Sequence, residues 1–566
     1  MKNRFLKSLL LLLPLAAAEA RSISPLDHPA DPQLRLHAGL DWLLERDRRA
    51  PAASWPAARN PVLSAESGPR SSLASQDLDS NGLARWAPAR WTQPDLALAL
   101  APVLTVRDWK SRESGMQEAG NGLDLEALWL DQWAVQLSFR DAQLTGDLAA
   151  RNHPGFERST SWLWQETSPD GRSLTHDETL ARLGWAHALG SESTLRVSIG
   201  REQPTWGPGL LGGVILRGER APGINLFRTS LDSGDLAFTF IMAELESQLV
   251  DSLALHADPV RVRQPWRQKW LVGHRLDLRG KSWAAGLGEL VVVGDEFPGP
   301  GYLNPVNFLW SEQHASGDRD NTLLFADLRV RLPRWLPGPG MVYGELSMDD
   351  YTLGDFGSDA EGQKTATLLG LAWAPPLEVL NPLGGTGRRS IWFIAEQRRI
   401  RPWFGSHFHQ ISSYTHGGQS LMGAGQPNSR LLDLALKLDQ RTSSTRIGAI
   451  TLEPGLLGLS LEGGQSLHGA NPPGLNIGGR IDEGHREGID PDHVRLLEGI
   501  LERQDWRRLR LDCRQPLSLA FSGRQRPAGV LQLDLAVARW NGHALAPGGE
   551  WVREFRIGWS SGSGTP

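Results

Sequence analysis

Acidic side chains concentrate in the segment YGELSMDDY and the loop after it, where Glu345 precedes the pair Asp349 and Asp350. Two carboxylates can hydrolyse a glycosidic bond when they face each other across a cleft. Neighbouring residues of a strand point to opposite faces, so Asp349 and Asp350 do not meet that condition. Asp355 and Asp359 would add oxygen ligands for calcium, but the spacing matches no defined calcium loop. We therefore interpret these carboxylates as partners of arginines inside the fold.

Histidines gather in a second candidate, the segment GSHFHQISSYTH with His407, His409 and His416. A His-x-His pair can chelate a metal from one face of a strand. The pattern supplies neither a fixed third ligand nor a carboxylate to orient the imidazoles, so hydrogen bonding inside the fold is the favoured role. The sequence also holds no Gly-x-Ser-x-Gly nucleophile, no phosphate-binding glycine loop and no cysteine cluster. We expect no catalytic residue, no metal site and no cofactor.

The third candidate is the segment GREQPTWGPGLLGGVILRGERAPG, residues 200–223. Trp206 can stack on a sugar or narrow a lumen. The Gly-Pro-Gly that follows it is typical of a sharp bend in which the tryptophan packs, and we favour this bend. Arg201, on a strand face inside a barrel, can pair with carboxylates of the protein or of an acidic polysaccharide.

The start of the chain has the features of an exported protein. A basic beginning, an apolar stretch over residues 8–17 and a small-x-small site ending at Ala20 are typical of a cleaved secretory signal. The apolar stretch is shorter than the roughly 18 residues of a membrane-spanning helix. Residues 31–49 repeat leucines at helical spacing behind the capping residue Asp31, which predicts one amphipathic helix. We expect a signal peptide over residues 1–20 and a helical segment with a polar linker over residues 21–90.

From about residue 95 onward the apolar pattern has a period of two. Leu123 and Leu125 alternate with Asp124 and Glu126, and residues 133–139 repeat the pattern, which predicts a hairpin. The same alternation recurs at 195–199, 236–242, 324–330, 367–373, 432–438, 531–537 and 551–559. One apolar face and one polar face suit either a β-sandwich or a transmembrane β-barrel.

Strand length and tryptophan placement favour the barrel. Many strands reach about ten residues, the length of a tilted membrane strand. Few segments are apolar on both faces, Leu290–Val293 being the main exception. Tryptophans also stand at strand ends, as an interfacial girdle requires. They are Trp109, Trp129, Trp133, Trp185, Trp270, Trp283, Trp373, Trp540 and Trp559.

The connections between strands differ in length. Periplasmic turns of such barrels are short, so the long polar connections are expected to be mainly extracellular. These connections are residues 145–177, 295–321, 349–364, 401–428 and 462–492.

The overall composition gives no sign of nucleic-acid binding, because the net charge is -5 with 22% charged residues. Tryptophan outnumbers tyrosine by 23 to 4, and tryptophan collects at membrane interfaces or against sugar faces. The single cysteine, Cys513, cannot form an internal disulfide and is interpreted as a small apolar filler.

Three motifs, in this order, resemble those of the Wzi family of outer-membrane capsule-assembly proteins. They are the Gly-Arg, Trp-Gly-Pro-Gly and Pro-Gly of residues 200–223, the Tyr-Gly-Glu strand of residues 343–351, and the block from Tyr414 to Ser429. The N-terminal helical region ending at Trp55 and Pro56 is also similar, so the resemblance spans most of the mature chain. It implies an all-β fold, a large monomeric antiparallel transmembrane β-barrel of roughly 18 strands with a short periplasmic helical segment.

The resemblance also implies a non-enzymatic role in the assembly and surface attachment of capsular or exopolysaccharide. External loops would bind an anionic polysaccharide in the manner of a lectin. Outer-membrane lipid, lipopolysaccharide and the barrel-assembly machinery are the other implied partners. A channel for polysaccharide or small solutes is the alternative, and a barrel-borne hydrolase ranks third. The barrel is expected over residues 91–560, with a tail at 561–566.

Two groups of site residues follow from the motifs and the resemblance. Those expected to contact a glycan or to line the lumen are Arg201, Trp206, Asp349, Asp350, Tyr414 and His416. Those expected to shape the fold are Gly200, Gly207, Pro208, Gly209, Tyr343, Gly344 and Glu345.

Overall fold

The computed structural model describes residues 87–560 with several gaps. The gaps are 94, 131, 154–155, 157–163, 191, 218–222, 254–265, 334, 352–361, 376–388, 424, 522–523 and 543–548. The signal peptide, the helical segment up to residue 86 and the tail predicted at 561–566 lie outside the described residues. Among the helices that are described, none is long and apolar enough to cross a membrane.

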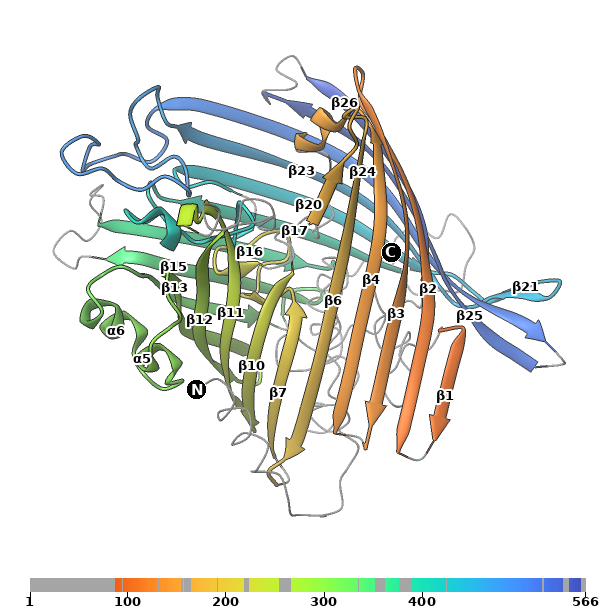
Figure 1. Ribbon diagram of the computed structural model, residues 1–566. Helices are drawn as coiled ribbons and strands as arrows, with labels where there is room; N and C mark the ends of the chain where they lie inside the picture. The colour runs from red at the N-terminus through yellow and green to blue at the C-terminus, as the bar shows by residue number, and fades with distance from the viewer. Residues whose placement is uncertain are drawn as a thin grey trace.

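The described strands form a closed 18-strand antiparallel barrel, which confirms the predicted fold class. The ring closes where the last strand, β26, pairs with β2. The first half of the wall is β2 (Leu96–Lys110), β3 (Gly115–Trp129), β4 (Trp133–Gly146), β6 (Ser173–Ala188), β7 (Ser193–Glu202), β10 (Ile224–Ser233), β11 (Leu236–Val250), β12 (Trp266–Arg279) and β13 (Trp283–Gly294). The second half is β14 (Asn321–Arg331), β15 (Gly340–Tyr351), β16 (Gln363–Trp373), β17 (Arg389–Ile400), β20 (Ser429–Arg441), β23 (Leu456–Ala470), β24 (Ile500–Phe521), β25 (Arg524–Asn541) and β26 (Glu550–Ser560). Figure 1 shows these strands as one curved wall.

The period of two gives the wall an apolar outer face and a polar inner face. On β20, the outward residues Leu432, Leu434 and Leu436 are exposed, whereas Asp433 and Ala435 between them are buried. The predicted hairpin pairs β3 with β4, and Asp124 and Glu126 are buried on its inner face. Cys513 belongs to the outer face and pairs with Leu457 and Leu533 on the neighbouring strands, as an apolar filler would.

Antiparallel pairing assigns each connection to one of two ends of the barrel. The short-turn end carries the starts of β2 and β4 and connections such as 130–132, 189–192, 234–235 and 280–282. The long-loop end carries 147–172, 203–223, 251–265, 295–320, 352–362, 401–428 and 471–499. All the long connections predicted from the sequence lie at the long-loop end. The largest differences from the predicted boundaries arise because β6 begins at Ser173, β23 continues to Ala470 and β24 begins only at Ile500.

A girdle of tryptophans surrounds the short-turn end, on the outer face. Its members are Trp129, Trp133, Trp185, Trp283, Trp373 and Trp559, which were all predicted. The prediction is wrong for Trp109 and Trp540, because they alternate onto the inner face near the long-loop end and are buried there. Tryptophan at a strand end is compatible with either the outer or the inner face of the wall. The position of a tryptophan in the sequence did not show which face it occupies.

Helices α5 (Pro300–Leu303) and α6 (Leu309–Ala315) lie against the outside of the wall beside β12 and β13 (Figure 1). Tyr302 and Leu309 from these helices pack on Val291 and Val293. The intervening Val292 faces the lumen and belongs to the interior core. Segment Leu290–Val293 is therefore apolar on both faces because both faces are covered by protein.

Short elements complete the fold. Strand β1 (Ala89–Gln93) pairs with the start of β2, and the hairpin of β21 (Thr445–Ile447) and β22 (Ile450–Leu452) pairs with β24 at the short-turn end. At the long-loop end lie 3-10 helix η4 (Leu148–Asn152), β5 (Trp164–Thr167), β8 (Thr205–Trp206), β9 (Leu216–Arg217), η7 (Gln410–Ser412), β18 (Thr415–His416) and β19 (Gln419–Ser420).

Candidate functional site

Strand β15 presents a row of polar side chains to the lumen. Tyr343, Glu345, Ser347 and Asp349 occupy alternate positions and are all buried, whereas Val342 on the opposite face is exposed. Buried polar groups need hydrogen-bond partners. These partners come from connections of the long-loop end that enter the lumen, which we call the inward segments.

The first inward segment, residues 203–217, is held by Glu345. The carboxylate accepts the backbone N–H of Gly209 at 2.8 Å and that of Val214 at 2.7 Å. Arg217 donates to the carbonyl oxygen of Gly209 at 2.8 Å and is one of the cations that act on Glu345. A carboxylate bonded to two amides satisfies backbone groups that would otherwise be buried without partners.

A second carboxylate, Glu396 on β17, holds the middle of the same bend. It accepts the backbone N–H of Leu210 at 2.5 Å and of Leu211 at 3.0 Å, together with the phenolic O–H of Tyr343 at 2.7 Å. Consecutive amides of the inward segment thus face carboxylates of two wall strands. The bend is fixed by charge-assisted hydrogen bonds from the barrel itself.

The bend requires glycine at two positions. Gly207 has a φ of 106°, and a Cβ there would overlap the Glu345 carboxylate. A Cβ on Gly209 would overlap the carbonyl oxygen of Gly212. Pro208, between the two glycines, has a fixed φ that stiffens the turn. The Trp-Gly-Pro-Gly motif therefore seats the chain directly over a buried carboxylate.

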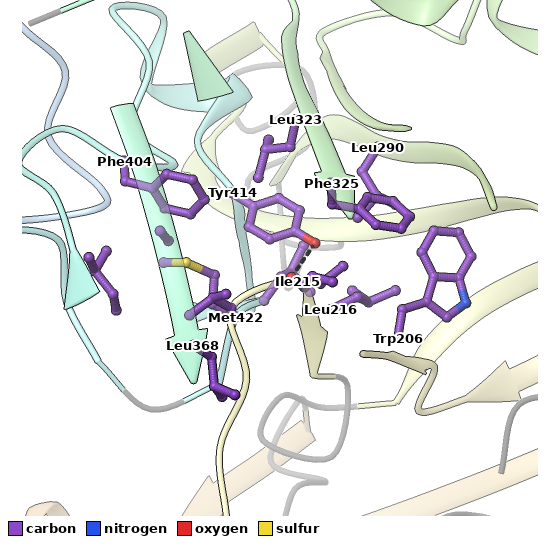
Figure 2. Packing of buried hydrophobic residues seen from close by; sticks show 14 of the residues in the cluster. Trp206, Ile215, Leu216, Leu290, Leu323, Phe325, Leu368, Phe404, Tyr414 and Met422 are labelled. Atoms are coloured by element: carbon purple, nitrogen blue, oxygen red, sulfur yellow. Dashed lines mark hydrogen bonds between the residues drawn. The ribbon is translucent and has the colours of Figure 1, made fainter. Parts of the chain in front are cut away.

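Apolar side chains of the first inward segment form the centre of the interior core (Figure 2). Trp206 is 2% exposed, and its ring lies 5.4 Å from that of Phe325 on β14. Ile215 and Leu216 are buried beside them. With its ring enclosed by protein, Trp206 is not available to a sugar in this conformation.

The second inward segment, residues 401–428, packs on the first. Tyr414 donates its phenolic O–H to the carbonyl oxygen of Ile215 at 3.0 Å, the bond drawn in Figure 2. The backbone N–H of Arg217 donates to the carbonyl oxygen of Leu421 at 2.7 Å. Burial raises the pKa of the Tyr414 phenol well above its usual value, so it stays a hydrogen-bond donor.

Wall residues also hold the second inward segment. Asp349 accepts the backbone N–H of Gly405 at 2.8 Å. His416 accepts the backbone N–H of Glu246 at 2.9 Å through its Nδ1 atom. Both side chains were predicted to contact a glycan or the lumen. The structure places them inside the lumen, where they join the inward segment to the wall.

A third inward segment, described at residues 147–153 and at Phe156, enters beside the seam between β26 and β2. Phe156 and His153 pack against Trp109, with ring centroids 5.9 Å and 5.4 Å away. The guanidinium of Arg107 lies 4.1 Å from the centre of the Phe156 ring, in cation–π geometry. Trp109 and Trp540, which face the lumen, therefore anchor this segment, since Trp540 also contacts His153.

Arginine–carboxylate pairs between strands line the rest of the lumen. Arg107 bonds to Glu554 at 2.7 Å across the seam, and Arg140 lies 2.9 Å from Asp124. Similar pairs are Arg228–Glu202, Arg275–Asp327, Arg398–Asp433, Arg508–Glu462 and Arg510–Asp534. These pairs involve other carboxylates than Glu345 and Asp349, for which the sequence predicted arginine partners.

Loop 471–499 covers part of the long-loop end and is internally bonded. Asp490 accepts the backbone N–H of Asn476 at 3.1 Å and the guanidinium of Arg486 at 2.7 Å. Although burial raises the pKa of Asp490, the stronger combined effect of the hydrogen bonds from Arg486 and Asn476 lowers it. The Asp490 carboxylate therefore joins two parts of the loop, which the amides of Asn471 and Asn476 also hold together.

An exposed aromatic ring lies beside this loop. Phe408 is 58% exposed, and the rings of His407 and His409 lie 4.3 Å and 4.2 Å from it. The backbone of Gly484, in loop 471–499, sits against His407. A flat ring flanked by imidazoles at the surface suits stacking on a sugar face.

The predicted position of Arg201 in the lumen is wrong. Arg201 alternates with Gly200 and Glu202 on β7, and Glu202 bonds to Arg182 and Arg228 in the lumen. Arg201 therefore shares the outer face with Ile199, which is 60% exposed. The motif spacing identified the strand but not its register, and a shift of one residue reverses the face.

The remaining predicted residues have mixed outcomes. Asp350 follows Asp349 in β15, and its side chain lies outside the described residues, as do Asp355 and Asp359. Gly344 alternates onto the outer face between Tyr343 and Glu345. Over the described part of the chain, no group of His, Cys, Asp and Glu side chains could hold a metal ion.

Sequence reasoning missed several residues that hold the inward segments. Glu396 was not singled out because it stands in a segment without a recognisable motif, and Arg217 was passed over although it lies within the segment of residues 200–223. Lys269 on β12 was also missed. It is 1% exposed and donates from its ammonium to the hydroxyl of Thr415 at 2.9 Å. The sequence offered no distinct signal for it, because the same strand face also carries Arg267 and Arg275.

No family model and no curated protein sequence matches this chain. Among solved structures, it is similar to Wzi of Escherichia coli, described as an outer-membrane protein involved in group 1 capsule assembly and a carbohydrate-binding β-barrel. The identity is 13%, with 94% of this chain and 98% of that one covered, and the TM-score is 0.49.

The chain is also similar to two solved structures from Pseudomonas aeruginosa. OccK5 (OpdH) has 12% identity, 82% coverage of this chain, 97% of that one and a TM-score of 0.38. OprD has 10% identity, 84% and 98% coverage and a TM-score of 0.37. At these identities and scores the fold assignment rests on the strand pairing described above, and membership of the Wzi family stays an inference from the motifs.

Proposed function

We propose that the protein is a non-enzymatic outer-membrane β-barrel that takes part in the assembly and surface attachment of capsular or exopolysaccharide. In this proposal the long-loop end faces the outside of the cell, and its exposed loops bind an anionic polysaccharide. The barrel acts as a monomer, and its interior serves mainly to position those loops.

The outer face supports a membrane location. An apolar face around a closed ring leaves no unpaired strand edge in the lipid, which is the requirement for crossing a bilayer with strands. The tryptophan girdle at the short-turn end suits a membrane–water interface. In outer-membrane barrels the short turns face the periplasm, which directs the long-loop end outward.

The hydrogen bonds of Glu345 and Glu396 carry the proposal for the interior. Both carboxylates face the lumen, yet they bind backbone amides of an inward segment. Trp206 and Tyr414, which were candidates for sugar contact, are buried in the same core. In this proposal the glycan binds at the exposed surface of the long-loop end, where Phe408 lies beside loop 471–499.

Deletion of the gene, followed by measurement of cell-bound and released polysaccharide, tests the proposal. We expect the released fraction to rise and to be restored by the unaltered gene. Phe408→Ala should give a partial defect, because stacking on an aromatic ring contributes about 1 kcal/mol. Phe521→Ala, at the short-turn end and 65% exposed, is the matched control. If the deletion strain retains and exports polysaccharide as the unaltered strain does, the proposal is wrong.

A channel is the second candidate, favoured by the charged pairs on the lumen side of β24–β26. Arg510 and Asp534 each keep 18% of their side chain exposed, and Arg556 keeps 27%. A water-filled path along these side chains would carry solutes past the inward segments. Recordings in planar bilayers discriminate, because a channel gives stepwise single-channel currents and a filled barrel does not.

A further inference from the structure

Cations face one another on the outer surface of the wall near the long-loop end. Arg507 on β24 stands directly across from Arg539 on β25, and Arg553 on β26 stands directly across from Lys110 on β2. All are exposed. Side chains directly opposite in an antiparallel pair have Cβ atoms about 5 Å apart, so facing cations repel.

We call this exposed group of cations the basic belt. Its members are Arg507, Arg539, Arg553 and Lys110.

The basic belt lies immediately beyond the apolar outer face. On β24 the next outward residue toward the short-turn end is Leu509, on β25 it is Val537, and on β26 it is Phe555. The step of two residues along a tilted strand is roughly 5 Å in height. The cations are thus at the level where lipid acyl chains give way to head groups.

Carboxylates of the protein offset only part of this charge, at Lys110 and Arg507. The ion pairs found among the described residues include none that joins a carboxylate to Arg539 or Arg553. Asp108 lies 3.4 Å from Lys110, and Asp505 is bonded to the neighbouring Arg503. Repulsion between facing cations is removed when an anion binds between them.

Trp551 adds an apolar component beside the belt. It lies across from Arg539, is 59% exposed on the outer face and has the guanidinium of Arg539 5.8 Å from its ring. Tryptophan at this level anchors in the head-group region, and the cation–π contact orients the arginine there. A purely soluble anion would not use this ring.

We propose that the basic belt binds the phosphate groups of anionic lipid head groups in the outer leaflet around the barrel. Each facing pair of cations clamps one phosphate, with guanidinium groups donating in bidentate fashion. The inference rests on the proposed membrane location, and it is independent of polysaccharide binding by the loops.

Binding of lipid A carrying two phosphates to the purified full chain in detergent micelles tests this inference by native mass spectrometry. Arg507→Gln/Arg539→Gln should weaken binding on the order of 30-fold, because each cation near a lipid surface contributes a roughly fivefold gain. Lipid A lacking both phosphates should bind the unaltered protein more weakly still, because the remaining pair of Arg553 and Lys110 then also has no phosphate to bind. Arg446→Gln, which removes an exposed arginine at the short-turn end, is the control and should not weaken binding.

A folding check accompanies each variant. Heat-modifiable mobility in gels reports a closed barrel, and Arg553→Gln/Lys110→Gln serves as a second variant if the first does not fold. Equal binding of the phosphorylated and dephosphorylated lipids, or unchanged binding by a folded double variant, would overturn the inference. Polysaccharide retention is measured separately, so failure of the loop proposal leaves the lipid result intact.

Discussion

Glu345 and Glu396, on β15 and β17, hold a single bend of the first inward segment between them. Glu345 accepts the amides of Gly209 and Val214, and Glu396 accepts the amides of the two leucines that lie between these residues. The Trp-Gly-Pro-Gly motif and the two wall carboxylates therefore depend on each other for their positions. Changes on either side should affect the same property, the seating of the inward segment in the lumen.

Glu345→Gln should loosen the first inward segment. The amide can offer only one oxygen to the two backbone N–H groups, and the cost of weakening a buried charge-assisted hydrogen bond is about 1.5 to 3 kcal/mol. We expect a lower unfolding temperature, measured by the loss of heat-modifiable mobility. Glu462→Gln is the control, because this lumen carboxylate pairs with Lys437 and Arg508 of the wall. Equal effects of the two substitutions would contradict a specific role in seating the segment.

Gly207→Val should impair folding. A side chain at a φ of 106° costs of order 1–3 kcal/mol, and the added Cβ would also displace the Glu345 carboxylate. Gly299→Val is the matched control, since a Cβ at Gly299 has open space around it. We expect the Gly207 variant to lose the folded band in gels while the control keeps it. A wild-type band for both variants would argue against the bend.

Arg201→Ala should leave the interior unchanged, because Arg201 faces outward. Conductance in planar bilayers and the unfolding temperature are expected to equal those of the unaltered protein, since surface substitutions usually change stability by no more than about 0.5 kcal/mol. Arg398→Ala is the comparison, because this buried arginine pairs with Asp433 in the lumen. A change in conductance for Arg201→Ala would place its side chain in the lumen after all.

Acid should release loop 471–499. The folded pKa of Asp490 is lowered, so its contribution to stability is complete above the unfolded value near 4 and is lost as the pH falls through the folded value. We expect the protection factor of the Asn476 amide, which corrects for the slower intrinsic exchange in acid, to fall below about pH 4. Asp490→Asn should give the same loss of protection at neutral pH, whereas Asp482→Asn, on an exposed carboxylate, should not. Full protection of the Asp490→Asn loop would show that another contact holds it.

The wall of the barrel could be predicted because its pattern is local. Alternation of apolar and charged residues at period two gives both the strands and their inner and outer faces, as in β20. The girdle was partly predictable for the same reason. Trp109 and Trp540 were assigned to the wrong face because a tryptophan at a strand end fits either a lipid interface or a packed inward segment, and only the register decides.

The interior of the barrel could not be predicted to the same degree. Motif order located Tyr343, Glu345 and the Gly-Pro-Gly bend, but nothing local in the sequence indicates that residues 186 positions apart, such as Leu210 and Glu396, are hydrogen-bonded. Partners of that kind depend on which connections turn inward. Leu290–Val293 was the one segment whose sequence indicated a covered inner face. A strand that is apolar on both faces needs protein packed on both sides.

Closure of the ring between β2 and β26 has a consequence for how the chain folds. Arg107 and Glu554, which meet across this seam, are 447 positions apart, so their hydrogen bond forms only after nearly the whole chain is in place. Pairings of such high sequence separation are slow, because loop entropy is lost before the contact forms. Until then β2 and β25 or β26 expose free edges that can pair with other chains. Loss of the last strand would therefore leave a barrel that aggregates rather than one that is merely shorter.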